Sequence, residues 1–372
     1  MTTDKHNKRP NVPPLRFPEF TEPWETAKLG DMTVNFSKRN KDEIEYPMYS
    51  VTNNRGFIPQ SEQFEDREMV SSDIKSYKII TKGDFAYNPA RINVGSIAKY
   101  NGDNDCMISS LYVAFRAKEQ INAEWLMQLL KTPKMNFYYN LNAEGGVRMY
   151  LFYPNFERIR TSYPSLNEQR KVAQFLDLLD HRIAVQSGLI NKLESLISGI
   201  IERLTAQSPN VRISDCLECH SSTLQENQLN DTGGYRVYGA NGICGYTDSP
   251  GINGDAILIV KDGSGVGNVS YAMGEYSVIG TSNYLTAKNG YSLRYLYYSL
   301  MKFNFVPYKT GMAIPHIYFK DYGKAKIYCP SLEEQERIAS NLSKIERKIE
   351  IERSIKDNCI MQKQYLLQQM FI

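Results

Sequence analysis

The sequence predicts an α+β protein in which two mixed, β-rich domains in a pseudo-twofold arrangement are separated by an antiparallel two-helix coiled coil. A Pro-Ser-Leu-x-Glu-Gln phrase occurs twice, as YPSLNEQRKV at 163–172 and as CPSLEEQERI at 329–338. Each copy is followed by a long stretch with helical apolar spacing. Each is preceded by short β-branched and aromatic runs split by Gly and Asn turns, which are typical of strands.

The repeated phrase is first a signal for the start of a helix. Ser165 with Glu168, and Ser331 with Glu334, fit the capping box, in which the serine accepts from a backbone N–H and the glutamate reaches back to the cap. The proline before each serine cannot extend a preceding helix and marks a break. Two unrelated helix starts would be the alternative, but the residues that follow each phrase also match.

Both long stretches carry the apolar spacing of a coiled coil. Steps of three and four residues recur over several heptads in the first stretch and continue in the second, which predicts helices of about 36–40 residues, roughly 55 Å long. Such a narrow stripe needs a partner, and the other helix is the obvious one; separate packing of each helix on its own domain is the alternative. The predicted seam consists of Leu176, Leu179, Ile183, Ile190, Leu193, Ile197, Leu342, Ile345 and Ile349.

Connectivity predicts the direction of the two helices. The first ends near Thr205 and leads into the second globular segment, which ends near Cys329 where the second helix begins. If the two ends of that segment lie close together, the second helix must run back antiparallel along the first. The globular segments would then sit at opposite ends of the helix pair.

The globular segments also repeat one another. VGSIAKYNG at 94–102 resembles VGNVSYAMG at 266–274, and GGVRMYLF at 145–152 matches GMAIPHIYF at 311–319. The second match has an offset of 166 residues (311 − 145), the same as that of the two phrase prolines (330 − 164). We therefore expect a disordered lead-in at 1–14, globular segments at 15–163 and 208–329, and helices at 164–207 and 330–372.

Bulk properties limit the class of protein. The 372 residues carry a net charge of only +3, so any nucleic-acid site must come from local arrangement. No apolar segment follows the polar start, and no run approaches membrane-spanning length, so we expect a cytoplasmic chain with no membrane contact. Cys216 to His220 reads C-x-x-C-H, but haem attachment of that kind would need export and a zinc site lacks further ligands. We expect no metal and no cofactor.

Motifs that would support catalysis are incomplete. Tyr87 to Ala90 reads YNPA and lacks the second proline and the aromatic residue of an adenine methyltransferase motif. DGSGVGN at 262–268 has Asn268 in place of the last glycine of G-x-G-x-x-G, and no helix pattern follows it. A tight turn between strands is the better interpretation. The sequence therefore predicts a protein that is not an enzyme.

The order of these features identifies a family. With LRFPEF and EPW within 15–24, the tandem globules and the paired phrases, the chain resembles the specificity subunit of a Type I restriction-modification system over nearly its whole length. The resemblance implies that each globule is a target recognition domain reading one half of a bipartite site in double-stranded DNA. It also implies that the helices set the spacing and dock two methyltransferase subunits, with restriction (motor and nuclease) subunits joining through the complex. A non-catalytic scaffold that bridges two protein partners is the alternative.

Candidate DNA contacts follow from the chemistry of base reading. Arg or Lys pairs with guanine, and Asn or Gln pairs with adenine, when loops present them. We favour Arg148 and Asn241, which lie in glycine-flanked loops with aromatic neighbours; Asn in particular also serves as an ordinary turn residue. The candidates are Asn53, Asn54, Arg55, Asn88, Arg91, Arg148 and Tyr150 in the first globule, and Tyr238, Asn241, Lys261, Ser264, Asn283, Lys309 and His316 in the second.

Overall fold

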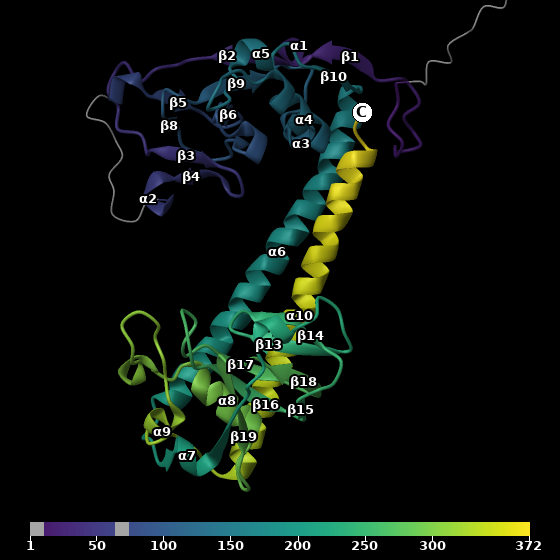
Figure 1. The fold of residues 1–372 in the computed structure, drawn as a ribbon. Coiled ribbons are helices and arrows are strands. Elements are labelled where there is room, and N and C mark those ends of the chain that lie inside the picture. The colour runs from purple at the N-terminus through teal and green to yellow at the C-terminus, as the bar shows by residue number, and fades with distance from the viewer. Residues whose placement is uncertain (1–10, 64–73) are drawn as a thin grey trace, which may run out of the picture. The chain divides into compact units, whose positions relative to one another are not determined.

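The computed structural model describes residues 11–63 and 74–372, which form two compact units. Unit 1 combines the chain up to Val185 with Lys356–Ile372, and unit 2 is Gln186–Ile355. Each unit contains a β-rich globule and one segment from each of two long helices (Figure 1). The predicted α+β class, with two β-rich domains and a long helix between them in the sequence, is confirmed. Within the described residues, no helix has the length and apolar character needed to span a membrane.

Unit 1 is built on a four-stranded antiparallel sheet in the order β2-β9-β6-β7. Its strands are β2 (Thr33–Phe36), β9 (Val113–Ala117), β6 (Phe85–Tyr87) and β7 (Ile97–Lys99). Among the described residues of the unit, three antiparallel pairs accompany this sheet: β1 (Glu25–Lys28) with β10 (Arg160–Tyr163), β3 (Tyr49–Thr52) with β4 (Gly56–Pro59), and β5 (Lys78–Ile80) with β8 (Cys106–Ile108). The helices are α1 (Leu29–Met32), α2 (Gln60–Gln63), α3 (Ala123–Leu130), α4 (Pro133–Asn142) and α5 (Tyr153–Phe156), with 3₁₀ turns η1 (Ile74–Ser76) and η2 (Ile92–Val94).

Unit 2 repeats this plan. Its sheet has the order β12-β19-β16-β17, so the first, last, second and third strands lie side by side as they do in unit 1. These strands are β12 (Leu217–Ser221), β19 (Ser282–Ala287), β16 (Ala256–Val260) and β17 (Val269–Ala272). A second sheet orders β14 (Gly242–Thr247), β13 (Tyr235–Gly239), β18 (Glu275–Val278) and β15 (Ile252–Asn253), and β11 (Val211–Arg212) pairs with β20 (Lys326–Ile327). The helices are α7 (Ile213–Cys216), α8 (Leu293–Met301) and α9 (Phe319–Tyr322), with η3 (Glu226–Gln228) and η4 (Val306–Tyr308).

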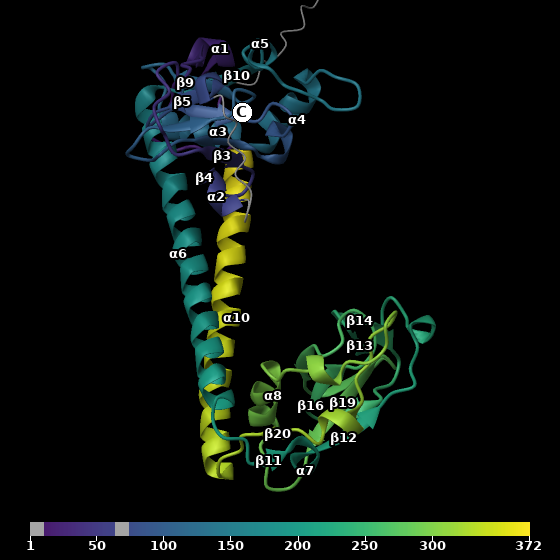
Figure 2. The ribbon, with the colours of Figure 1, turned by 90° about the vertical axis from the view of Figure 1, so that its left-hand side faces the viewer.

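The two long helices, α6 (Leu166–Thr205) and α10 (Leu332–Gln369), contribute a segment to each unit, and both views show them side by side within each (Figures 1 and 2). In unit 1, Lys363 of α10 binds Asp180 of α6 at 2.6 Å, and the backbone N–H of Leu15 donates to the Gln369 carbonyl beside the start of α6. In unit 2, the side chain of Asn210, just after α6, pairs with the backbone of Cys329, just before α10. The helix segments therefore run antiparallel in each unit.

The predicted seam residues lie on the packed faces of these helices. Leu176, Ile190, Ile197, Leu342 and Ile349 are buried, and Leu179, Leu193 and Ile345 are half-buried against the same cores. Ile183 is half-buried. In unit 1, the α6 seam joins the core that includes Trp125 and Leu367, so the helix packs on its own globule and on α10 together.

The helix starts differ in one respect from the predicted capping boxes. The serine half is present but long, with Glu168 N–H to Ser165 Oγ at 3.5 Å and Glu334 N–H to Ser331 Oγ at 3.4 Å. The glutamate half was predicted wrongly, because the carboxylates bind elsewhere. Glu168 is 1% exposed and accepts from Arg16 at 2.7 Å and from the Trp24 indole at 3.2 Å, and Glu334 pairs with Arg337.

The glutamine of each phrase connects the start of the long helix to its globule through hydrogen bonds. Gln169 accepts from the backbone N–H of Asn122 at 2.7 Å and donates to the Pro164 carbonyl at 2.9 Å. Gln335 does the same with Ser292 and Pro330, at 3.0 and 2.9 Å. Asn122 and Ser292 are the N-caps of α3 and α8, so one buried amide joins two helix starts in each unit.

Asn11 departs from the predicted disordered lead-in. Residues 1–10 of the predicted lead-in lie outside the described part. Asn11 lies inside that lead-in, yet its side chain donates to Ser162 Oγ at 3.1 Å and its carbonyl accepts from Trp24 N–H at 2.7 Å. Asn11 is therefore ordered, although it lies before residue 15.

Candidate nucleic-acid interface

Three loops converge in unit 1, and most of the predicted reading residues lie on them. The β3–β4 turn carries Asn53, Asn54 and Arg55, and the β6–β7 loop packs directly on it. Ser96 Oγ donates to the Val51 carbonyl at 2.6 Å, and a Cβ on Gly95 would lie 3.3 Å from the Asn53 carbonyl oxygen. This close approach explains the glycine, which also has φ +94°.

The two loops line an open pocket of about 370 Å³. Five of the seven candidates in unit 1 line it together, although they come from segments about 35 residues apart in the sequence: Asn53, Asn54, Arg55, Asn88 and Arg91. Tyr112 and Glu62 complete its wall. The pocket therefore combines amide and guanidinium groups, the donors and acceptors that base edges require.

The side chains in this pocket are not equally available. Arg55 makes an exposed ion pair with Glu62 at 2.6 Å, which costs little to exchange for another anion. Asn88 accepts from the backbone N–H of Ala90 at 3.0 Å, so its carbonyl shapes the loop while its amide donor can face a ligand. Asn53, Asn54 and Arg91 are exposed.

The third loop of unit 1, which we call the 144–150 loop, carries Arg148 and Tyr150. Glu144 and Tyr150 exchange backbone hydrogen bonds of 2.9 and 2.8 Å, and the Leu151 N–H donates to the Pro89 carbonyl at 2.9 Å. Tyr150 stacks on Phe152 with ring centroids 5.8 Å apart, and Arg148 is exposed. The anchor at Pro89 places this loop directly beside the loop that carries Asn88 and Arg91.

Unit 2 has the same three loops. Asn241 is exposed in the β13–β14 turn, before Gly242 with φ +100°. The β16–β17 loop packs on this turn, because a Cβ on Gly265 would lie 3.6 Å from that of Ala240. The 310–316 loop is closed by backbone hydrogen bonds of 2.9 and 2.7 Å between Thr310 and His316. It is anchored to the β16–β17 loop by the Ile317 N–H, which donates to the Lys261 carbonyl at 2.9 Å.

A carboxylate organises two basic side chains of unit 2. Asp262 accepts from Lys261 Nζ at 2.6 Å and pairs with His316 Nδ1 at 2.7 Å. Burial alone would raise the pKa of Asp262, but the hydrogen bonds from Lys261 and His316 outweigh it and lower the pKa. Asp262 was not among the predicted contacts, and its position in the sequence between the candidates Lys261 and Ser264 was the available signal. Lys309 and Ser264 are exposed on the same loops.

Two candidates of unit 2 point into the protein. Asn283 is only 5% exposed, and its side-chain oxygen accepts from Ser221 Oγ at 2.9 Å, so its prediction as a DNA contact is corrected to a bond between β12 and β19. Tyr238 is half-buried and packs edge-on against Tyr276 with centroids 5.5 Å apart. Both lie on strands, where alternate side chains face inward.

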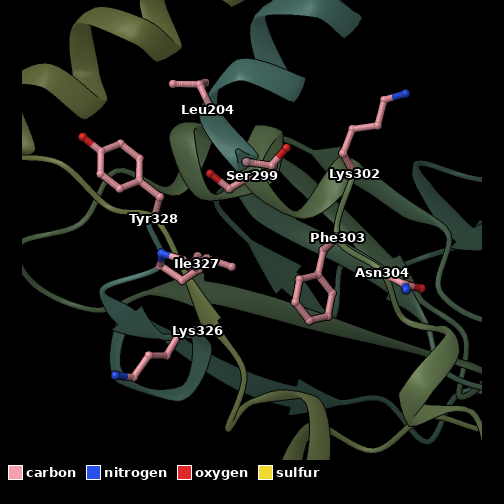
Figure 3. Close-up of a pocket in the computed structure, with 10 residues that line it drawn as sticks. Leu204, Ser299, Lys302, Phe303, Asn304, Lys326, Ile327 and Tyr328 are labelled. Carbon is pink, nitrogen blue, oxygen red and sulfur yellow. The ribbon is translucent and has the colours of Figure 1, made fainter. Parts of the chain in front are cut away.

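A separate cavity of about 260 Å³ lies at the end of α6 in unit 2, away from the three loops. Leu204, Ser299 and Phe303 surround it (Figure 3). Thr205, on its rim, corresponds to Phe371 in unit 1, because the same 166-residue offset separates the starts of α6 and α10 (332 − 166) and these two residues (371 − 205). Phe371 stacks on Trp125 with ring centroids 5.9 Å apart, whereas Thr205 lines a cavity, so the two equivalent positions make different contacts.

Similarity to known proteins agrees with this duplicated architecture. The model of the Type I restriction modification DNA specificity domain matches residues 21–195 and 209–359. The putative type I restriction enzyme MjaX specificity subunit of Methanocaldococcus jannaschii is 23% identical over 53% of this chain and 49% of its own length. The type I restriction enzyme EcoprrI specificity subunit of Escherichia coli is 27% identical over 30% of this chain and 28% of its own length. The chain thus spans about half or less of the length of these curated relatives.

A solved structure gives the same result for the fold. The Type-I restriction-modification S subunit from M. genitalium has a TM-score of 0.67 and 14% identity, covering 97% of this chain and 99% of its own. The family match falls once on each of the duplicated globules and covers most of the chain. This protein therefore belongs to the Type I restriction-modification DNA specificity family.

Proposed function

We propose that this protein is the sequence-specific DNA-binding subunit of a Type I restriction-modification complex, and that it reads a bipartite site in double-stranded DNA. The observation that carries the proposal is the cluster of three loops, built once in each unit on the same sheet order. A single-site reader has no need for two such clusters. The chain itself would be non-catalytic, with methyl transfer and cleavage performed by other subunits.

Within each unit, the loops would divide the work of recognition. The exposed amides of Asn53, Asn54 and Asn241 suit adenine, and the guanidinium groups of Arg91 and Arg148 suit guanine. Contacts to phosphates would hold the unit in register without carrying sequence information. The scaffold beneath the loops is buried and bonded, which supports a preformed reading surface.

The long helices would set the spacing of the half-sites and dock the partners. Helix side chains that the chain itself does not cover support a docking role: Leu178 is 69% exposed and Met361 is 58% exposed. We infer that two methyltransferase subunits bind these helices and that restriction subunits join through the complex. A short insertion near Ser187, with a matching insertion in α10, should lengthen the unread spacer and leave both half-sites unchanged.

The direct test is a map of methylated adenines in cells that carry the complete system. We expect one bipartite motif, with two short specified halves and an unspecified spacer. The purified chain alone should transfer no methyl groups to DNA. A complete complex that assembles but neither binds nor methylates DNA specifically would favour a protein scaffold instead.

A further inference from the structure

The third loop of each unit carries a fully exposed apolar side chain at its tip. Val147, on the 144–150 loop, is 103% exposed, and Met312, on the 310–316 loop, is 106% exposed. Among the described residues, these are the two most exposed large hydrophobic side chains. Met149 and Ile314, near them on the same loops, are exposed at 46% and 58%. The two loops occupy equivalent places, since 166 residues separate Glu144 from Thr310 (310 − 144).

Both loops have a backbone shape that fixes where the tip projects. Each is closed at its base by two backbone hydrogen bonds, and each begins with a glycine of positive φ: +140° at Gly145 and +88° at Gly311. A Cβ on Gly145 would lie 2.0 Å from the Arg148 carbonyl oxygen, and one on Gly311 would lie 2.3 Å from that of Ile314. Only glycine fits either position, so the loop folds tightly and holds its aliphatic tip outward.

The tips project from the candidate reading surface. The 144–150 loop is bonded to Pro89 beside Arg91, and in unit 2 the Gly263 N–H donates to the Pro315 carbonyl at 3.0 Å. Exposed cations flank both tips, with Arg148 in unit 1 and Lys309 in unit 2. An apolar tip beside a cation suits a surface that is anionic outside and apolar within. Stacked base pairs behind a phosphate backbone are such a surface, and proteins that kink DNA insert aliphatic side chains between base steps.

We propose that Val147 and Met312 are apolar wedges, each inserting between two adjacent base pairs of the half-site that its unit reads. The proposal rests on the proposed function and adds a mechanical element to it. Each wedge unstacks one step and bends the duplex, so the cost depends on the deformability of that step. The wedges would therefore contribute preference for flexible pyrimidine–purine steps at positions without hydrogen bonds to bases.

The test uses the complete methyltransferase complex and duplexes that carry its mapped site. 2-Aminopurine replaces one adenine at a time, and the methylated adenines are omitted because the methyltransferase extrudes them. We expect fluorescence to rise at one step in each half-site. Met312→Ala should abolish the rise in the half-site read by unit 2 and leave the other unchanged, and Val147→Ala should do the reverse.

Matched variants and substrates separate the outcomes. Met312→Leu keeps an apolar tip and should keep the signal, whereas Met312→Ala should weaken specific binding about tenfold, within the range typical of one lost base contact. Unchanged fluorescence and affinity in both alanine variants would overturn the wedge. The wedge would also be overturned if replacing thymine by deoxyuracil lowered the affinity while no 2-aminopurine position showed a fluorescence rise. That result would mean that the apolar tip contacts a thymine methyl group in the groove. Specific binding without a rise in 2-aminopurine fluorescence would contradict this inference alone. Absence of specific binding by the wild-type complex would contradict the proposed function.

Discussion

Units 1 and 2 have the same strand order and the same three loops, but their loops carry different chemistry. Unit 1 presents guanidinium groups, from Arg91 and Arg148, beside a pocket lined with asparagines. Unit 2 presents Lys261 and His316, both held by Asp262. The backbone bonds that anchor the loops are conserved between the units, whereas the side chains that face outward are not. The duplication thus separates what supports recognition from what would determine its sequence.

The units also differ in how they complete their cores. Unit 1 closes the corner at the end of α10 with Phe371, packed between Trp24 and Trp125. Unit 2 places Thr205 at the same position and keeps a cavity of about 260 Å³. Equivalent positions therefore differ in their contribution to stability, although the fold around them is the same.

A charge in the helix seam of unit 2 should have the largest effect. Ile349 is 6% exposed and packs with Leu342 and Ile190, so Ile349→Asp would bury a carboxylate without a partner. We expect a loss of roughly 3–5 kcal/mol in the free energy of unfolding, and loss of the complex with it. Ile351→Asp is the matched control for stability alone, because Ile351 is 47% exposed and the substitution should leave the free energy of unfolding nearly unchanged. Chemical denaturation and co-purification with the methyltransferase measure both; equal behaviour of the two variants would contradict the seam.

Truncation of Phe371 tests the difference in core completion. Phe371→Ala should cost about 3–5 kcal/mol, because it removes a ring packed on two tryptophans. Thr205→Ala, at the equivalent position, should cost less than about 0.5 kcal/mol because Thr205 is exposed. Thr205→Phe should instead gain about 0.5–2 kcal/mol by filling the cavity. Thermal unfolding measures the stability of the three variants. Similar losses in both alanine variants would show that positions 205 and 371 contribute equally to stability.

The glutamine clamps should matter equally in both units. Gln169→Ala and Gln335→Ala each leave a helix-cap N–H, of Asn122 or Ser292, without its acceptor. We expect each to cost about 1–3 kcal/mol, the usual penalty for an unsatisfied buried donor. Denaturant titrations measure the loss, with Gln→Glu as the variant that keeps an acceptor for the N–H. A large loss in one unit and none in the other would contradict the equivalence of the helix starts.

Asp262 should give the smallest effect, and one that depends on pH. Its pKa is lowered in the folded protein, so its ion pairs add stability above the unfolded pKa of about 3.9, and this contribution is lost as the pH falls through the folded value. Asp262 is 28% exposed, so the contribution should stay below about 1 kcal/mol. Asp262→Asn should be less stable than the wild type at pH 7, and the difference should disappear once the pH falls below the folded pKa of Asp262. A difference that persists at low pH would point to packing rather than charge.

Sequence reasoning succeeded where signals were local and repeated. The helix starts follow from a six-residue phrase, and the loop positions follow from glycines and asparagines that suit turns. It failed where a distant residue decided the outcome. Glu168 does not cap its helix as predicted, because its carboxylate accepts hydrogen bonds from Arg16 and Trp24, which are 152 and 144 residues away in the sequence. Asn283 has a suitable residue type for DNA, but its strand pairs with β12, which turns its side chain toward Ser221.

The sequence likewise could not predict that Asn53 to Arg55 cluster with Asn88 and Arg91. Their types and turn positions singled them out, but only the contact between Gly95 and the Asn53 turn brings them to one pocket. The exposed tips at Val147 and Met312 carried no predicted signal, because an aliphatic residue in a loop is indistinguishable from a core residue until its burial is known.

The central claim is that each unit reads its own half of one bipartite site. The measurement that tests it most directly is the methylation map of a complete system in which residues 211–328 are replaced by the matching segment of a relative with a different target. The account predicts that one half of the methylated motif changes to the relative's half, while the other half and the spacer length are retained. A change in both halves, or in neither, would contradict the division of recognition between the two units.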